Sequence, residues 1–323
     1  MKVQCQLCPK NCIIDNGQSG NCHVRINIDG TLRAITYGFP CSINIDPIEK
    51  KPLFHFLPSS TALSLATAGC NLHCLFCQNW EISQGAPSDV QAFKAEPEKI
   101  IELAQKYKSP SIAYTYSDPV VFYEYTLDTS KLARSINIKN VLVTAGYINE
   151  EPLKQLLEYT DAANIDLKGI TDDFYQEICS ATLKPVLNAL VLTKAAGVHL
   201  EVTNLIVPTL NDKPQQIREL VRWIRDNLGT DTPLHFSRFF PLYKLTHLVP
   251  TSEQTLTEAR QIALEEGMEY VYIGNIASKE GQNTYCPKCK KLLIERSGYT
   301  ILQNRLKDGT CPYCGKKIYG VWK

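Results

Sequence analysis

The sequence carries almost no net charge. Its 323 residues include 34 Lys and Arg against 33 Asp and Glu, which gives a formal net charge of +1. A strongly basic chain would indicate nucleic acid or an anionic membrane as the partner, and this balance gives no such indication. An RNA held by local contacts stays compatible with a neutral chain.

Several sequence features that define common protein classes are missing. No apolar run approaches the roughly 18 residues of a membrane-spanning helix. The N-terminal stretch MKVQCQLCPK has no apolar core followed by a small-residue cleavage site, so it does not resemble a signal peptide. There is no internal repeat, phosphate-cradling glycine loop, His-x-x-x-His zinc motif or nucleophile elbow. We therefore expect a cytoplasmic protein without a membrane partner.

Cysteine, in contrast, is abundant and clustered. Disulfides are disfavoured in the cytoplasm, and cysteines with two-residue spacers indicate metal sites. Cys41 and Cys179 stand apart, and we predict that both are small buried apolar residues. The other eleven form an N-terminal set (Cys5, Cys8, Cys12, Cys22), a central set (Cys70, Cys74, Cys77) and a C-terminal set (Cys286, Cys289, Cys311, Cys314).

These sets divide the chain into three predicted domains, at 1–57, 58–280 and 281–323. The middle domain alternates strand-like and helix-like segments, which predicts parallel strands with right-handed crossovers. Either an α/β barrel or an open doubly wound sheet would satisfy that pattern. Polar motifs follow three of the predicted strands, as in barrels, so we favour a partial (β/α)6-type barrel. The predicted strands are Leu63–Thr67, Ser111–Tyr116, Asn140–Ala145, Ala163–Lys168, His199–Val207, Pro233–Phe239 and Tyr270–Asn275.

The two terminal sets each offer four thiolates. The C-terminal set forms two Cys-Pro-x-Cys knuckles, which predict a tetrahedral structural site for zinc, with rubredoxin-like iron as the alternative. The N-terminal set has spacings that fit neither ferredoxin pattern, so we place zinc ahead of a second iron–sulfur cluster. His23 could substitute for one thiolate there, and a site without metal is the third alternative.

The central set stops at three cysteines. Three thiolates on a 4Fe-4S cluster leave one iron without a protein ligand, and that iron can bind a substrate or cofactor directly. This suits a catalytic cluster rather than a simple electron carrier.

The Cys-x3-Cys-x2-Cys spacing of the central set resembles that of the radical S-adenosylmethionine (SAM) enzymes. The resemblance implies that the open iron chelates SAM, and that reductive cleavage gives methionine and a 5′-deoxyadenosyl radical. It implies that Phe76 packs near the adenine. The family's Gly-Gly-Glu stretch is replaced by TYSDPV, so Ser117 and Asp118 take the positions that bind the cofactor's amino group, with an ordinary turn as the alternative. Asp166 and Lys168 in NIDLKG resemble the Asp-x-Lys motif of the activating-enzyme branch, with Lys168 pairing with the cofactor carboxylate.

Other polar residues are weaker candidates. We predict that His235, Arg238 and Tyr243, in LHFSRFFPLYKL, lie where the sixth barrel strand ends and hold cofactor or substrate. His55 is a candidate to bridge the N-terminal segment to the barrel, and buried structural roles are equally compatible with these four residues. Thr203 and Asn204 are candidate contacts to adenosine through their backbone groups, with an ordinary loop as the alternative.

A longer set of motifs narrows the resemblance. CQLCPKNC, GNCHVR, DPIEKKPLFHF, GCNLHCLFCQNWEISQ, NTYCPKC, CPYCG and GVW together resemble the radical enzyme of the AmmeMemoRadiSam group, which is related to pyruvate formate-lyase activating enzymes. This implies Memo-like and AMMECR-type companion proteins and an external one-electron reductant of the ferredoxin or flavodoxin class.

Two function classes follow from the sequence. The first is a radical SAM enzyme, with a small molecule or RNA favoured slightly as substrate over a glycyl-radical enzyme, because the additional domains at both ends depart from a minimal activase. The second is a non-catalytic zinc-ribbon interaction module, which explains the terminal sets but not the central one.

Overall fold

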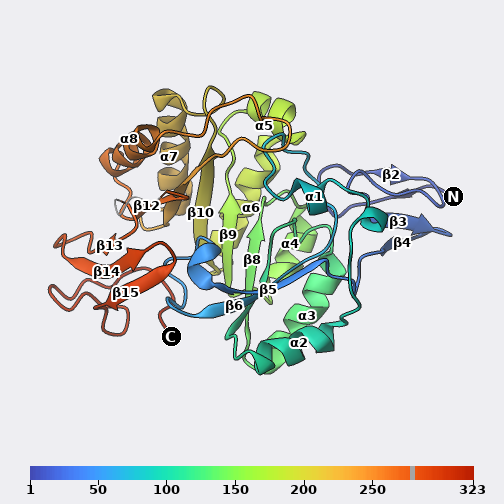
Figure 1. The fold of residues 1–323 in the computed structure, drawn as a ribbon, viewed down its shortest axis with the longest axis horizontal. Helices are drawn as coiled ribbons and strands as arrows, with labels where there is room; N and C mark the ends of the chain where they lie inside the picture. Colours follow the sequence, from blue (N-terminus) through green and yellow to red (C-terminus); the bar gives the residue numbers. More distant parts are fainter. Residues whose placement is uncertain (277–280) are drawn as a thin grey trace.

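The computed structural model describes residues 1–276 and 281–323, and an eight-stranded sheet forms its centre (Figure 1). Seven of these strands are parallel, and their neighbours in the sheet follow chain order. β5 (Ser42–Pro47) pairs antiparallel with β6 at one edge, and β12 is the other edge. The parallel strands are β6 (Thr61–Ala66), β7 (Ser111–Tyr114), β8 (Lys139–Thr144), β9 (Ala162–Asp166), β10 (His199–Ile206), β11 (Leu234–Arg238) and β12 (Val271–Gly274).

All seven strands predicted for the middle domain are present, within two residues at each end. Their order does not reverse anywhere along the sheet. A doubly wound sheet reverses its order at a switch point, so that alternative is wrong for this chain. The predicted end of the middle domain at residue 280 lies outside the described residues.

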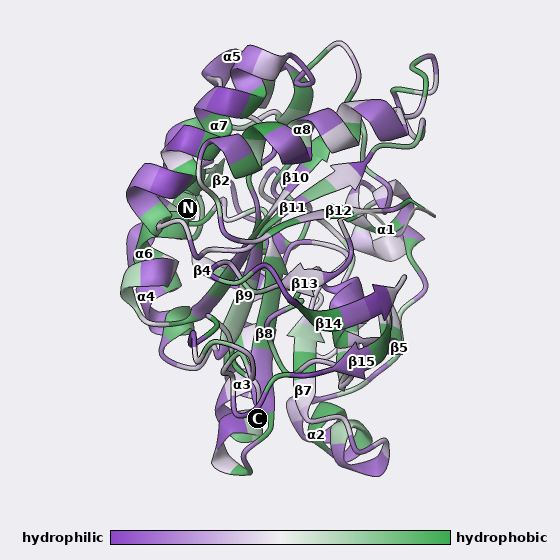
Figure 2. Ribbon diagram, turned by 90° about the vertical axis from the view of Figure 1, so that its left-hand side faces the viewer, coloured by the Kyte–Doolittle hydropathy of each residue, from purple (hydrophilic) through white to green (hydrophobic). Residues whose placement is uncertain are grey.

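The helices connect these strands and pack on one another in sequence. α2 contacts α3, α4 contacts α6, and α7 lies between α6 and α8. In Figure 2 the helices alternate hydrophobic and hydrophilic surface, as expected where one face meets the sheet and the other meets water. The helices are α1 (Trp80–Ser83), α2 (Pro97–Lys106), α3 (Tyr123–Ser135), α4 (Glu150–Leu157), α5 (Asp172–Cys179), α6 (Leu183–Ala195), α7 (Pro214–Leu228) and α8 (Glu253–Glu265), with 3-10 turns η1 (Ile48–Lys50) and η2 (Pro87–Asp89).

Two small units flank the sheet and lie at opposite ends of the molecule's long axis in Figure 1. The N-terminal unit contains the antiparallel pairs β1–β2 and β3–β4, and the C-terminal unit is a three-stranded ribbon. Their bounds are β1 (Val3–Gln4), β2 (Ile13–Ile14), β3 (Arg25–Ile28), β4 (Thr31–Ala34), β13 (Thr284–Tyr285), β14 (Leu292–Ser297) and β15 (Thr300–Asn304).

A buried carboxylate joins three parts of the chain. Glu201 of β10 is fully buried and accepts hydrogen bonds from the Nε2 atoms of His199 at 3.0 Å and His235 at 2.6 Å. It also accepts from the backbone N–H of Phe54 and of His55. Burial alone would raise the pKa of Glu201, but the two imidazoles hold that pKa below its usual range. The network therefore fixes the segment before β6 against the sheet.

His55 extends this network to the C-terminal unit. Its ring nitrogens lie 2.6 Å from the Tyr272 hydroxyl and 2.6 Å from the Tyr319 carbonyl oxygen. The expectation that His55 bridges the N-terminal segment to the sheet is therefore confirmed. Among the described residues, no helix combines the length and apolar character needed to cross a bilayer.

Candidate functional site

Three loops at the carboxyl ends of β6, β7 and β9 carry the predicted site residues. Parallel strands bring these ends to one edge of the sheet, so residues far apart in the sequence become neighbours. Two contacts show that the loops are close together. The Asn79 side chain, just after Cys77, donates to the Tyr116 carbonyl at 2.8 Å, and the Lys168 ammonium lies 5.8 Å from the centre of the Phe76 ring. The structure therefore brings together residues from the three predicted motifs.

The central set lies in a loop that hydrogen-bonds its own sulfurs. The Leu72 N–H donates to the Cys70 sulfur at 3.4 Å, and the Cys77 sulfur lies 3.1 Å from the Ser83 hydroxyl. Burial, with the charge of Asp118, raises the pKa of Cys70 well above its ordinary value. The raised pKa keeps the Cys70 thiol protonated without a metal. Binding an iron cluster would displace the thiol proton, because metals bind the thiolate.

The sulfur spacing distinguishes this set from a zinc site. Zinc bonds of about 2.3 Å hold four sulfurs about 3.8 Å apart in a tetrahedron. A 4Fe-4S cluster binds each thiolate to a different iron, so its cysteine sulfurs lie further apart. Within the described residues, the central set does not gather its sulfurs within 4.8 Å of one another, whereas the C-terminal set does. The three thiols can therefore serve as ligands of a polynuclear cluster, and they lack the close spacing of the C-terminal set.

Cys179 is a neighbour of the site that sequence reasoning missed. The neighbouring Cys179 thiol, followed by burial, raises the pKa of Cys74 well above its ordinary value. The Cys179 carbonyl also accepts from the His73 N–H at 3.0 Å. The predicted burial of Cys179 is confirmed. Cys41 is only half-buried, because it lies at the edge-strand side of the sheet, so its predicted burial is wrong.

Ser117 and Asp118 shape the loop after β7. The Ser117 hydroxyl donates to the Thr67 carbonyl at 2.7 Å. The Asp118 carboxylate accepts from the N–H groups of Val120 and Ala145, at 3.0 and 2.8 Å, and from the Thr144 hydroxyl. These contacts fix the loop after β7 against the end of β8.

Asp166 and Lys168 form an ion pair at the end of β9, with Nζ 2.8 Å from Oδ2. The Lys168 ammonium lies 5.8 Å from the centre of the Phe76 ring, and Phe76 stacks on Phe174. Burial works against the lysine's charge, but Asp166 contributes to a pKa well above the ordinary value. A cation is therefore held beside the aromatic residue of the cysteine loop.

Two buried polar atoms near these residues have no hydrogen-bond partner within the described chain. Thr203 pairs in register with Asp166, and its hydroxyl is one of them. Asn71 follows Cys70 directly, and its amide oxygen is the other, while its amide nitrogen donates to the Tyr147 carbonyl. The side-chain nitrogen of Asn204 donates to the Leu167 carbonyl at 2.7 Å. Unpaired buried polar atoms indicate room for a polar ligand.

His235 is the second residue of β11 and lies in register with Thr203, while its ring is held by the buried Glu201 carboxylate. That contact occupies the Nε2 atom of His235, and its role in holding cofactor or substrate stays a prediction. Arg238 is the last residue of β11, as predicted. In the loop beyond it, Tyr243 stacks on Trp80 of α1 with ring centres 5.5 Å apart.

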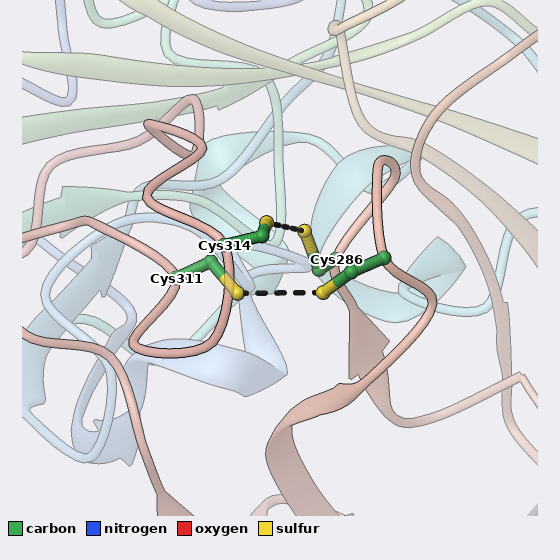
Figure 3. A group of neighbouring side chains, drawn as sticks. Cys286, Cys311 and Cys314 are labelled. Atoms are coloured by element: carbon green, nitrogen blue, oxygen red, sulfur yellow. Dashed lines mark hydrogen bonds between the residues drawn. The ribbon is translucent and has the colours of Figure 1, made fainter.

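The C-terminal set forms a compact sulfur group between two knuckles (Figure 3). The sulfurs of Cys286 and Cys314 lie 3.5 Å apart, and those of Cys289 and Cys311 lie 3.6 Å apart. All four atoms lie within 4.8 Å of one another. These separations match the tetrahedral spacing of a single metal ion. The predicted four-cysteine cluster is present.

Comparisons with known proteins agree with this geometry. A family model described as the radical SAM superfamily matches residues 64–224. An uncharacterized protein of Methanocaldococcus jannaschii is 51% identical over 319 residues, which cover 98% of this chain and 95% of that protein. A pyruvate formate-lyase-activating enzyme of Clostridium pasteurianum is 26% identical over 163 residues, covering 49% of this chain and 67% of that enzyme. A radical SAM methyltransferase from Sphaerobacter thermophilus has a similar fold, with a TM-score of 0.54 at 15% identity over 70% of each chain.

Proposed function

The chain belongs to the radical SAM superfamily and is an enzyme that uses SAM radical chemistry, and we propose that Cys70, Cys74 and Cys77 are the ligands of its 4Fe-4S cluster. The observation that carries the proposal is the convergence of this three-thiol loop with the loops of Asp118 and Lys168 at one edge of the sheet. The non-catalytic alternative is overturned by the family.

The chain's own side chains would bind and orient SAM. When bound, the cluster supplies the electron that cleaves SAM to methionine and a 5′-deoxyadenosyl radical. Lys168, held by Asp166, would pair with the SAM carboxylate, and Phe76 would pack on the adenine. Ser117 and Asp118 would fix the loop that meets the amino group.

Asn204 and its neighbour Thr203 would position the nucleoside. The Thr203 hydroxyl is buried and unpaired within the described residues, so it can hydrogen-bond a ribose or adenine atom without losing another contact. Asn204 holds the Leu167 carbonyl, and it would thereby fix the backbone between Asp166 and Lys168.

The architecture supports a partial barrel with two accessory domains, at 1–57 and 281–323. Strand order follows the chain without reversal, and the helices contact one another in sequence, as in a barrel wall. We propose zinc for the C-terminal set, because two knuckles closing four sulfurs around one point form a structural S4 site. Its role would be to fold a ribbon with too small a core of its own.

We propose a substrate other than a glycyl-radical enzyme, with a small molecule or RNA favoured. The pyruvate formate-lyase-activating enzyme matches 49% of this chain. The additional four-cysteine units at both ends depart from a minimal activase. The AmmeMemoRadiSam assignment, with Memo-like and AMMECR-type companions, rests on the sequence motifs. So do the cytoplasmic location and the ferredoxin- or flavodoxin-class reductant.

Anaerobic reconstitution with iron and sulfide, followed by SAM and dithionite, tests the proposal. The expected products are methionine and 5′-deoxyadenosine in equal amounts, measured by liquid chromatography and mass spectrometry. If the wild-type chain forms no 5′-deoxyadenosine while a control radical SAM enzyme does, the proposal fails. Stimulation of 5′-deoxyadenosine by small-molecule extracts, by RNA, or by a glycyl-radical enzyme then separates the substrate classes.

A further inference from the structure

The N-terminal set surrounds a single cavity. All four of its thiols, from Cys5, Cys8, Cys12 and Cys22, line this cavity. Local hydrogen bonds shape the loops that carry them, because the Cys5 N–H donates to the Cys12 carbonyl at 2.8 Å and the Asn11 N–H donates to the Cys8 carbonyl at 3.0 Å. Four sulfurs therefore face one enclosed space rather than four separate environments.

The sulfurs of the N-terminal set are less closely gathered than those of the C-terminal set. Within the described residues, the N-terminal set does not gather three ligand atoms within 4.8 Å of one another. The C-terminal set does so with the same number of cysteines. A cluster that binds each thiolate to its own iron needs the wider spacing. The geometry favours an iron–sulfur cluster over the zinc that the spacing in the sequence favours.

The cavity wall also suits a negatively charged cluster. The Asn21 N–H donates to the Cys12 sulfur at 3.4 Å. Arg25 lines the cavity with its two terminal nitrogens paired to Glu124 and its buried Nε atom without a partner among the described residues. Apolar side chains, among them Val120, cover the rest of the wall. Hydrogen bonds to the sulfurs and exclusion of water are the main protein controls on a cluster's reduction potential.

The cavity lies directly against the loop of the central set. Asn71, the residue after Cys70, lines the cavity. Asn21 hydrogen-bonds His73 at 2.9 Å. At Gly69, the residue before Cys70, a Cβ atom would lie 2.7 Å from the Cys22 carbonyl oxygen. The N-terminal set therefore lies against the residues on both sides of Cys70.

We propose that Cys5, Cys8, Cys12 and Cys22 bind a second 4Fe-4S cluster that supplies electrons to the central site. The electron-supply role rests on the function proposed above, whereas the cluster itself does not. A one-electron protein reductant of the flavodoxin or ferredoxin class is oxidised by one electron at the N-terminal cluster. The same electron passes to the central site, where the sulfur–C5′ bond of SAM breaks to give methionine and the 5′-deoxyadenosyl radical, with no proton transferred.

Metal analysis of a variant without the central set tests the cluster by itself. In the variant Cys70→Ala, Cys74→Ala and Cys77→Ala, reconstituted anaerobically, we expect about four acid-labile sulfides per chain and an electron paramagnetic resonance signal on reduction. Adding Cys286→Ser and Cys311→Ser should leave the sulfide unchanged, since a mononuclear iron or zinc site contains none. Sulfide-free protein with a second zinc overturns the proposal.

The electron-supply role of the N-terminal cluster is tested in a variant that keeps the central set intact. In the variant Cys12→Ser and Cys22→Ser, sulfide should fall by about half. With a flavodoxin-class reductant, 5′-deoxyadenosine formation should fall about tenfold or more, while with dithionite it should stay within about twofold of wild type. Equal loss with both reductants overturns the relay, with circular dichroism reporting the folding of the variant. If wild type gives no 5′-deoxyadenosine while the first variant keeps its sulfide, the proposed function fails and the cluster stands.

Discussion

The two ends of the chain each carry four cysteines, yet the structure arranges them in opposite ways. The C-terminal set closes its sulfurs within 4.8 Å of one another, at a distance from the central loop along the molecule's long axis (Figure 1). The N-terminal set spreads its sulfurs around a cavity whose wall includes Asn71, next to Cys70. We therefore propose that equal ligand counts serve different chemistry here, because sulfur spacing selects the metal centre and proximity to the site selects its role.

The largest effect is expected when the central set loses a cysteine, because that set has no fourth thiolate to replace it. Cys74→Ala should reduce SAM cleavage to the uncatalysed background, because the cluster would lose one of three ligands. Cys41→Ala is the matched control, since Cys41 lies outside all three sets and should retain wild-type activity. The measurement is 5′-deoxyadenosine formed with dithionite after reconstitution. A Cys74→Ala rate equal to wild type would show that the cluster assignment is wrong.

Removing the C-terminal metal should affect stability and leave the cluster chemistry intact. Cys289→Ser with Cys314→Ser should abolish zinc binding and lower the thermal midpoint by about 5–10 °C, because metal binding contributes folding energy to the ribbon. Zinc and sulfide contents with calorimetry provide the measurement. An unchanged midpoint, or a loss of sulfide in place of zinc, would contradict the distinction between the two ends.

Lys168→Met should raise the KM for SAM more than it lowers kcat. Losing a hydrogen-bonded charge pair costs about 1.5–3 kcal/mol, which corresponds to a roughly 10- to 100-fold higher KM for SAM. Lys168→Arg keeps the charge and should recover part of the loss. KM and kcat are to be measured separately, and a change in kcat alone would place Lys168 elsewhere in the reaction.

The smallest effect concerns the contact between the N-terminal set and the central loop. Gly69 has φ +94°, and a Cβ there would lie 2.4 Å from Val24 Cγ2 as well as against the Cys22 carbonyl. Gly69→Ala should destabilise the protein by about 1–3 kcal/mol through strain and overpacking.

Gly197 offers the matched control, because it has φ +75° with no atom within 4 Å of a Cβ. Gly197→Ala should show the backbone strain alone. Denaturant unfolding measures both variants, and rates with a protein reductant should fall only in Gly69→Ala. Equal behaviour of the two variants would argue against a close contact between the two sets.

Most helices and strands of the fold could be predicted from local sequence patterns. The apolar residues of 212–228 recur at helical spacing, and Ile217, Leu220 and Ile224 are indeed buried in α7 between Pro214 and Gly229. The seven strands followed from short apolar runs, and the strand-end motifs at 115–118 and 166–168 lie at one edge of the sheet. These features depend on neighbours within a few residues, which a sequence displays directly.

Other features depended on partners distant in the chain. Cys179 was predicted to be only a small apolar residue, yet α5 brings it to the cysteine loop, where its carbonyl accepts from the His73 N–H at 3.0 Å. His235 was expected to hold cofactor or substrate, and its ring is bound by Glu201 of the neighbouring strand. No local spacing encodes either contact, because each arises when separate strands and helices pack together.

The sequence by itself determined how many thiolates each set offers, including the missing fourth ligand of the central set and the strand that precedes it. Ligand count follows from composition and spacing alone. Only the tertiary structure decided how far apart the sulfurs lie, and that the N-terminal set rather than the C-terminal one lies against the central loop. Those distances result from long-range packing, such as the contact of Gly69 with Cys22, which no local pattern contains.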